Sequence, residues 1–155
     1  AKLYHQFGVE TTYEDQSIVL SKHNHKKPRH FSENLQNCPD IAQTIAVTCL
    51  ALGVDCDLRG LHTLKIKETD RLVALKNEIE KFGSKVEISD DRLQLSPRKE
   101  FNSGVKIATY NDHRMAMAFA PMGLKLPIEI EDAGVVSKSY PDFWKDLKQL
   151  GFSID

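Results

Sequence analysis

Apolar residues recur along the chain with two different periods, and these predict a series of short helices and strands. The clearest helical pattern spaces apolar side chains by three, four and three positions, at Leu72, Leu75, Ile79 and Phe82. This spacing lines one face of an amphipathic helix, which we expect to run over 67–82 and to end at Gly83. Two further helices are predicted at 1–7 and 143–150, each followed by a glycine.

Two other stretches are apolar nearly all round, which is typical of helices buried on every side. The first runs over 41–53, and Asp40 is well placed to be its N-cap. The second covers Met115–Ala120, and Pro121 should kink or end it.

Alternating and β-branched segments predict the strands. They lie at 9–13, 17–21, 56–59, 85–89, 92–96, 105–109 and 128–130, and a last strand is expected to begin at 152–154. Residues 23–30 form a polar segment with three histidines. Because no carboxylate or thiolate stands at ligand spacing from them, we expect a solvated loop there and not a metal site.

The order of these elements repeats. A helix that ends in an apolar residue plus glycine precedes a strand at Phe7-Gly8, at Phe82-Gly83 and at Leu150-Gly151. The repeating unit is strand–helix–strand–helix–strand–strand, about 70 residues long, which predicts an α/β (α+β) fold with helices buried against sheets. By this division, 1–22 is the end of one unit, 28–97 is one complete unit and 105–155 is most of a further one. This further unit lacks its last strand. Because an unpaired sheet edge favours aggregation, we expect another part of a longer protein to supply that strand.

Composition narrows the class of protein. With 155 residues, 41% of them apolar and 28% charged, the chain is long and apolar enough for one globular domain. The net charge of −1 argues against a nucleic-acid or membrane-surface protein, and no apolar run reaches the roughly 18 residues of a membrane span. The three cysteines are odd in number and lack C-x-x-C spacing, which argues against a disulfide scaffold and against a zinc site. We therefore expect the protein in a reducing cytoplasm. The N-terminal residues lack signal-peptide character and resemble the middle of a helix. This pattern suggests that the sequence is a segment of a longer chain.

Charged residues gather at four predicted strand-to-helix junctions: Asp40, Lys67–Arg71, Asp112–Arg114 and Lys138. In repeats of one unit these junctions lie on the same side, where α/β folds bind ligands at helix N-termini. Lys67 and Arg71 oppose the helix dipole, so a structural explanation is weaker for them than for Glu68 or Asp70. The alternative is four independent solvated helix starts with i,i+4 pairing.

A site made of these residues would suit an anion. Arginines such as Arg71 and Arg114 can grip a carboxylate or phosphate with two hydrogen bonds, and Lys67 and Lys138 add charge. The carboxylates of Asp40 and Glu68, and a lysine, could move protons if neighbouring charges shift their pKa values.

Four motifs in these regions resemble one enzyme family. They are Pro-Asp-Ile-Ala-Gln-Thr at 39–44, Lys-Glu-Thr-Asp-Arg at 67–71, Tyr-Asn-Asp-His-Arg-Met-Ala-Met-Ala at 110–118 and Ser-Lys-Ser-Tyr-Pro-Asp-Phe at 137–143. In this order they are similar to 3-phosphoshikimate 1-carboxyvinyltransferases, the EPSP synthases. The resemblance implies transfer of the enolpyruvyl group of phosphoenolpyruvate to shikimate 3-phosphate with release of phosphate, in aromatic amino-acid biosynthesis. It also implies two domains, each with three of the repeated units.

The resemblance also implies roles for single residues. Asp40 matches the carboxylate that contacts the acceptor hydroxyl and acts as a candidate base, and Lys67 matches the lysine near that hydroxyl. Glu68 matches the glutamate beside the methylene carbon of phosphoenolpyruvate. The cations that hold phosphoenolpyruvate match Arg71, Arg114 and Lys138. His113 lies next to that site in the motif, and Thr63 stands where the family often has asparagine, which puts that contact in doubt.

The motifs that hold the shikimate phosphate in the family have no counterpart in this sequence. The resemblance therefore implies the C-terminal third of an enzyme, inactive alone, whose partners are its two small-molecule substrates and the rest of the parent chain. No metal or organic cofactor is implied. Two alternatives stay open: the related enolpyruvyl transferase that acts on UDP-N-acetylglucosamine, and a non-catalytic anion-binding module.

Overall fold

The structure is a computed structural model that describes residues 1–23, 27–66 and 70–155. Its α-helices are α1 (Lys2–His5), α2 (Ala42–Leu52), α3 (Arg71–Lys81), α4 (His113–Phe119) and α5 (Phe143–Gln149). Short 3₁₀ helices are η1 (Pro39–Ile41), η2 (His62–Ile66), η3 (Ala120–Leu124) and η4 (Ala133–Lys138). The strands are β1 (Val9–Tyr13), β2 (Ile18–Lys22), β3 (His30–Asn34), β4 (Asp55–Arg59), β5 (Lys85–Ile88), β6 (Leu93–Ser96), β7 (Val105–Ile107) and β8 (Ile128–Ile130).

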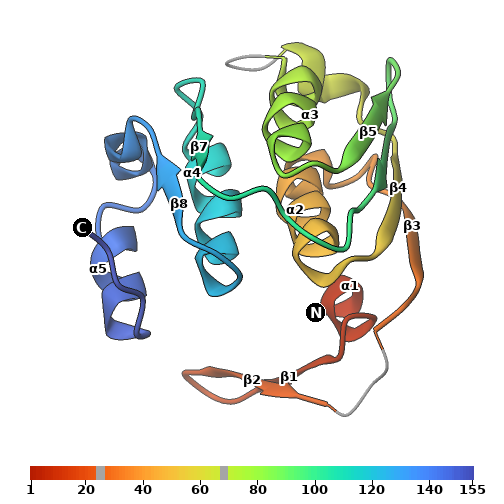
Figure 1. Cartoon of the computed structure of the whole chain (residues 1–155). Coiled ribbons are helices and arrows are strands. Elements are labelled where there is room, and N and C mark those ends of the chain that lie inside the picture. The colour runs from red at the N-terminus through yellow and green to blue at the C-terminus, as the bar shows by residue number, and fades with distance from the viewer. Residues whose placement is uncertain (24–26, 67–69) are drawn as a thin grey trace.

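The centre of the molecule is a four-stranded mixed sheet in the order β3-β4-β6-β5. β3 runs parallel to β4, whereas β6 is antiparallel to both of its neighbours. The sheet stands on one side of α2 and α3, and α4 with the parallel pair β7-β8 lies on the other side (Figure 1). The hairpin β1-β2 projects from the far end of the sheet, near the N-terminus. The mixture of helices and sheets confirms the predicted fold class.

Helix α2 is packed on most sides, and its exposed residue Thr44 faces the surface. It contacts β4 and β6 of the sheet, α3 beside it and α4 behind it. Gly53 ends it in the left-handed conformation, at φ 63°, as the sequence predicted. Burial of several aliphatic side chains on such a helix, at about 1.5–3 kcal/mol each, makes it the main apolar support of the fold.

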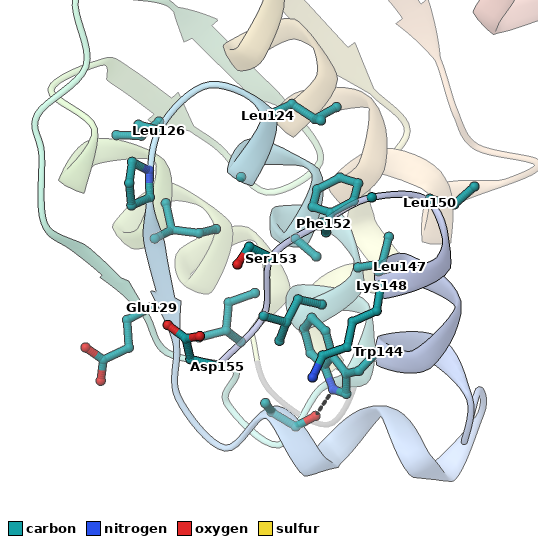
Figure 2. Close-up of a pocket in the computed structure, with 18 of the residues that line it drawn as sticks. Leu124, Leu126, Glu129, Trp144, Leu147, Lys148, Leu150, Phe152, Ser153 and Asp155 are labelled. Atoms are coloured by element: carbon teal, nitrogen blue, oxygen red, sulfur yellow. Dashed lines mark hydrogen bonds between the residues drawn. The ribbon is translucent and has the colours of Figure 1, made fainter.

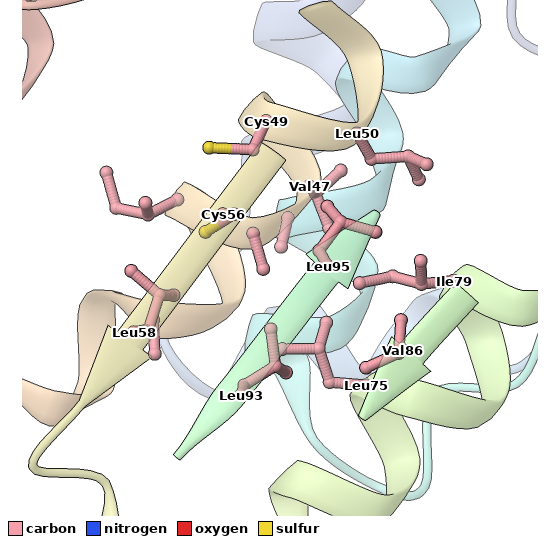
Figure 3. Packing of buried hydrophobic residues seen from close by; sticks show 14 of the residues in the cluster. Val47, Cys49, Leu50, Cys56, Leu58, Leu75, Ile79, Val86, Leu93 and Leu95 are labelled. Atoms are coloured by element: carbon pink, nitrogen blue, oxygen red, sulfur yellow. The ribbon is translucent and has the colours of Figure 1, made fainter. Parts of the chain in front are cut away.

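The main core lies between the sheet and these helices (Figure 3). Val86, Leu93 and Leu95 from β5 and β6 point toward Leu75 and Ile79 of α3. Cys49 of α2 and Cys56 of β4 are buried in the same core. A hydrogen bond with Cys49, together with burial, raises the pKa of the Cys56 thiol far above its ordinary value. These two thiols therefore act as small apolar side chains.

Three of the predicted elements differ from the structure. Residues 30–34 form strand β3, although His30 was predicted to lie in a polar loop. This segment has a single apolar side chain, Phe31, so alternation gave no signal, and its place at the sheet edge comes from parallel pairing with β4. Residues 152–155 are not a strand, because no described strand pairs with them. Strand β7 ends at Ile107, not 109, because the next amide, of Ala108, donates to the Glu78 side chain.

The helix ends agree better with the prediction. Helix α4 ends at Phe119, and Pro121 is the second residue of η3, which agrees with the expectation that a residue without an amide hydrogen ends the α-helix. In the described part of the chain, no helix is long and apolar enough to cross a membrane.

Two glycines allow the cost of a steric clash to be separated from the cost of a positive φ. Gly60 and Gly104 both have positive φ, at 76° and 67°. A Cβ at Gly60 would lie 2.6 Å from the Gln36 nitrogen, whereas a Cβ at Gly104 would meet nothing within 4 Å. Gly104→Ala should cost about 1–2 kcal/mol from conformation alone. Gly60→Ala should cost about 1–3 kcal/mol more, because the 34–36 backbone must move. Urea unfolding of both variants measures this, and equal losses would contradict the structure.

Candidate functional site

The buried guanidinium of Arg71 is the centre of the candidate site. Arg71 is the first residue of α3, and its side chain is only 1% exposed. Its Nε donates to Oδ2 of Asp112 at 2.6 Å, and its Nη1 donates to Oδ1 of Asp40 at 2.8 Å. A buried cation is tolerated only when it is paired and hydrogen-bonded, and these two carboxylates meet that need.

Asp112 is fixed from several directions. It is fully buried and is the N-cap of α4, where Oδ1 accepts the amide hydrogen of Arg114 at 2.9 Å. Its other oxygen, Oδ2, accepts from Arg71 and from Nε2 of Gln43 at 3.3 Å. One carboxylate therefore joins the starts of α3 and α4 to helix α2, which carries Gln43.

Asp40 connects the buried arginine to the surface. It lies in η1, and its half-exposed carboxylate accepts from Arg71 through one oxygen and from Nη2 of Arg114, at 3.3 Å, through the other. The prediction that Asp40 is the N-cap of α2 is wrong. The N-cap is Ile41, without a side-chain bond, because the chain enters α2 through a 3₁₀ turn that points the Asp40 carboxylate toward the two arginines instead.

An open pocket of about 320 Å³ lies beside this group. Its described lining residues are Asp40, Ile41, Thr44, His113, Arg114, Met117 and Ser139. Arg114 is one-third exposed and faces the pocket, whereas Arg71 supports Asp40 from behind it. His113 Nε2 lies 3.1 Å from Ser139 Oγ, so α4 and the end of η4 meet at the pocket wall. The pocket thus presents a cation, a carboxylate, an imidazole and hydroxyl groups.

The structure brings Asp40, Arg71, Arg114 and His113 together, as the junction argument expected. Lys138 is exposed at the end of η4, and its neighbour Ser139 lines the pocket. Lys67 and Glu68 lie outside the described residues, so their predicted roles remain predictions.

The predicted helix start was wrong. α3 begins at Arg71, and the N-cap is Asp70, whose carboxylate accepts from the Leu72 and Val73 amides at 3.1 Å. Cap geometry explains the later start, because an N-cap side chain that bonds these two amides fixes the first helical turn directly after it.

Sequence reasoning gave no role to two residues that shape the site, Asp112 and Gln43. A signal for Asp112 existed, because an acidic residue at an N-cap followed by an arginine in the first turn suggests a partner elsewhere. Gln43 belongs to the motif at 39–44, but no contact was predicted for it. Its Oε1, the Thr63 hydroxyl and the Thr109 hydroxyl are buried without a hydrogen-bond partner among the described residues.

A larger groove of about 1090 Å³ lies elsewhere, between β8, α5 and the C-terminal residues (Figure 2). Trp144, Leu147 and Phe152 point into it, and Trp144 Nε1 donates to the Ala133 carbonyl at 2.9 Å. It shares no lining residue with the arginine pocket and gathers no cluster of like charge. Because of its chemistry, and not its size, we take the smaller pocket as the candidate site. The described residues include no group of three or more His, Cys, Asp or Glu side chains that could hold a metal ion.

Comparison with known proteins gives the class and then the family. The solved EPSP synthase of Acinetobacter baumannii superimposes with a TM-score of 0.76 at 19% identity, over 99% of this chain and 39% of that one. The enolpyruvyl transferase NikO from Streptomyces tendae gives 0.67 at 18% identity, over 99% of this chain and 35% of its own. The fold is that of the enolpyruvyl transferases.

Sequence relatives identify the family within this class. The model of the family EPSP synthase (3-phosphoshikimate 1-carboxyvinyltransferase) matches residues 1–147. A 3-phosphoshikimate 1-carboxyvinyltransferase of Bacteroides fragilis is 43% identical over 99% of this chain, and one of Neisseria meningitidis is 31% identical over 97%. This chain belongs to the EPSP synthase family. It spans 38% and 35% of the length of these two relatives.

The buried pair can be tested with two helix caps. Asp70 and Asp112 are both N-caps whose side chains accept backbone amides, but only Asp112 faces an arginine. Asn caps a helix as well as Asp, so Asp70→Asn should change stability by less than about 0.5 kcal/mol. Asp112→Asn leaves the Arg71 charge buried and should cost roughly 3 kcal/mol or more. Chemical denaturation measures both, and equal effects would show that Asp112 serves only as a cap.

Proposed function

We propose that this chain is part of an enzyme that transfers the enolpyruvyl group of phosphoenolpyruvate to shikimate 3-phosphate and releases phosphate. Family membership supports this reaction. The observation that carries the proposal is that residues from three separate motifs come together: Asp40 and Arg114 line one pocket, and Arg71 holds Asp40 from behind it. We place the enzyme in the cytoplasm, which the free cysteines favour.

In this proposal Arg114 holds the anion. Its guanidinium faces the pocket, and its bond to Asp40 is long at 3.3 Å, so a phosphate or carboxylate of phosphoenolpyruvate can compete for the same donors. Arg71 holds Asp40 from the buried side and orients it. Among the described residues, Asp40 and Asp112 offset the charges of Arg71 and Arg114. Lys67 and Lys138 are the candidates for further cations that attract the substrate.

Proton transfer falls to the carboxylates. The acceptor hydroxyl must lose a proton as its oxygen bonds to the enolpyruvyl carbon, and the methylene carbon gains and then loses one as phosphate leaves. A guanidinium cannot exchange protons near pH 7, whereas a carboxylate can if its pKa is suitably placed. We assign the hydroxyl proton to Asp40 with Lys67 nearby, and the methylene proton to Glu68. No metal or organic cofactor takes part in this scheme, because lysine and arginine supply the positive charge.

The shape of the chain supports its being one part of a larger fold. The hairpin β1-β2 follows α1 as β5-β6 follows α3, yet Leu93 and Leu95 are at most 2% exposed whereas Ile18 and Leu20 are over 60% exposed. The apolar face of the hairpin is therefore covered in β5-β6 and exposed to solvent in β1-β2. We infer that the preceding part of a longer chain covers the exposed face.

The C-terminal unit supports the same inference. In the central sheet β4 has a parallel neighbour, β3, and an antiparallel neighbour, β6. β8 has its parallel neighbour β7, and the larger groove runs along its residues 128–130, where the described chain provides no second partner. A strand from elsewhere in the protein fits there and would complete the proposed unit at 105–155.

The choice of acceptor separates this proposal from its competitors. NikO is an enolpyruvyl transferase of the same fold, so the fold leaves the acceptor open. Phosphate release by the full-length protein should depend on phosphoenolpyruvate together with shikimate 3-phosphate. Release with UDP-N-acetylglucosamine instead would favour the related transferase. Release with neither would favour a non-catalytic anion-binding module.

The 155-residue chain alone should show no turnover. Catalysis needs the acceptor held against phosphoenolpyruvate, and the groups that would hold the shikimate phosphate have no counterpart in its sequence. Binding of phosphoenolpyruvate should be weak, in the millimolar range that corresponds to about −4 kcal/mol. Calorimetry and a phosphate-release assay on the purified chain measure both, and turnover by this chain would contradict the proposal.

Steady-state kinetics of the full-length protein can separate the two roles. Arg114→Ala should chiefly raise the KM for phosphoenolpyruvate, by about 10- to 100-fold, because a change of this size corresponds to the free energy of one charged hydrogen bond. Glu68→Gln keeps the shape but removes the titrating group, so it should lower kcat with smaller changes in KM. Arg59, which pairs with Asp57 on β4, is the matched arginine control, and Arg59→Ala should leave both constants unchanged. An intact kcat in Glu68→Gln together with an intact KM in Arg114→Ala would overturn these roles.

A further inference from the structure

A second buried charge lies on the same helix as Arg71. Glu78 of α3 is fully buried and stands seven residues after Arg71, two helical turns further along the same side. No sequence motif in the EPSP synthase resemblance includes it. A fully buried glutamate is rare and needs partners, so its contacts indicate what it does.

The partners of Glu78 lie mainly in the segment that leads to the site. Its Oε1 accepts the Tyr110 hydroxyl at 2.8 Å, and its Oε2 accepts the Ala108 amide at 3.1 Å. Lys81, one turn further along α3, places its Nζ 2.6 Å from Oε2 and balances the charge. Burial and the bond to Glu78 raise the pKa of Tyr110, so its hydroxyl stays protonated and remains the donor.

The segment held in this way has an unusual backbone. Tyr110 and Asn111 are consecutive residues with positive φ, at 53° and 56°, and neither is glycine. The left-handed conformation is tolerated by asparagine but unfavourable for tyrosine, so at Tyr110 it persists only where surrounding contacts enforce it. Directly after them come Asp112, which pairs with Arg71, and then His113 and Arg114, which line the pocket. This turn therefore sets the direction in which the site residues leave β7.

We propose that Glu78 is a positioning residue of the site: by holding Ala108 and Tyr110 it keeps the 110–111 turn left-handed and thereby places Asp112, His113 and Arg114 against Arg71 and Asp40. Helix α3 then holds the segment 108–112 at two points, with Glu78 at its beginning and Arg71 at its end. The catalytic part of this inference rests on the proposed function, whereas the geometric part does not.

The first test compares two glutamates of α3 in the full-length protein. Glu78→Gln should lower kcat/KM for phosphoenolpyruvate by about 10- to 100-fold, because a small displacement of catalytic groups has an effect of that size. Glu80 is the matched control, since it pairs with Lys76 and accepts the Val86 amide, away from the turn. Glu80→Gln should retain activity within about twofold. Tyr110→Phe, which removes one bond only, should give a smaller loss and guards against a failure of Glu78→Gln to fold.

Rescue distinguishes positioning from general stabilisation. Glycine adopts positive φ without strain, so Asn111→Gly should restore part of the activity that Glu78→Gln loses. A general loss of stability would instead lower the melting temperature and leave kcat/KM unchanged at temperatures well below it. Unchanged kcat/KM in folded Glu78→Gln, or a loss that Asn111→Gly does not reduce at all, would overturn the proposal.

A second readout does not depend on the reaction. The Arg71 Nε–H group donates to buried Asp112, so its hydrogen should exchange slowly with water in the 155-residue chain. This exchange is followed by NMR through the attached ¹⁵N nucleus. Glu78→Gln should speed this exchange by about tenfold or more, and Glu80→Gln should not. Unchanged exchange in folded Glu78→Gln would overturn the positioning role. Absence of activity in the full-length wild type, with the exchange altered as expected, would overturn only the proposed function.

Discussion

The arrangement of the molecule depends on one buried cation. Arg71 brings a positive charge to a place with 1% exposure, which is unfavourable unless carboxylates accompany it. Asp112 meets it from the start of α4 and Asp40 meets it from the turn before α2. Three helix starts are thereby held at one point, and separating α3 from α4 would break the fully buried Arg71–Asp112 pair. The geometry of the pocket follows from this constraint.

Charge balance gives the same group a functional character. The aspartates neutralise the arginines, so the site is stable before any substrate arrives. Asp40 bonds both arginines, tightly to the buried one at 2.8 Å and less closely to the exposed one at 3.3 Å. An anion that takes the donors of Arg114 would leave the bond between Asp40 and Arg71 in place. In our proposal the binding of phosphoenolpyruvate and the readiness of the candidate base are thus linked through one carboxylate.

Apolar packing of α2, α3 and α4 supports the group formed by Arg71, Asp112 and Asp40. α2 is surrounded by the sheet, α3 and α4, and the stacked rings of Phe82 and Phe119, with centroids 6.1 Å apart, join the ends of α3 and α4. The aromatic contact holds the two helices at one end and the Arg71–Asp112 pair holds them at the other. Glu78 lies between these contacts and bonds the segment that joins β7 to α4. The ends of the two helices are therefore held by one apolar and one ionic contact, and Glu78 adds a hydrogen-bonded contact to the segment before α4.

The sequence by itself determined the helices and most strands, and it pointed to Asp40, Arg71, His113 and Arg114, which the structure brings together. These follow from local signals: apolar periodicity, glycine and proline at helix ends, and charged residues that oppose a helix dipole. Tertiary structure alone decided that Asp40 faces two arginines instead of capping α2, that Glu78 and Gln43 support the site, and that 30–34 is a strand. Each of these depends on a partner 25 or more positions away in the chain. Local pattern cannot show such a partner, because the free energy of a buried charge or an edge strand is set by what packs against it.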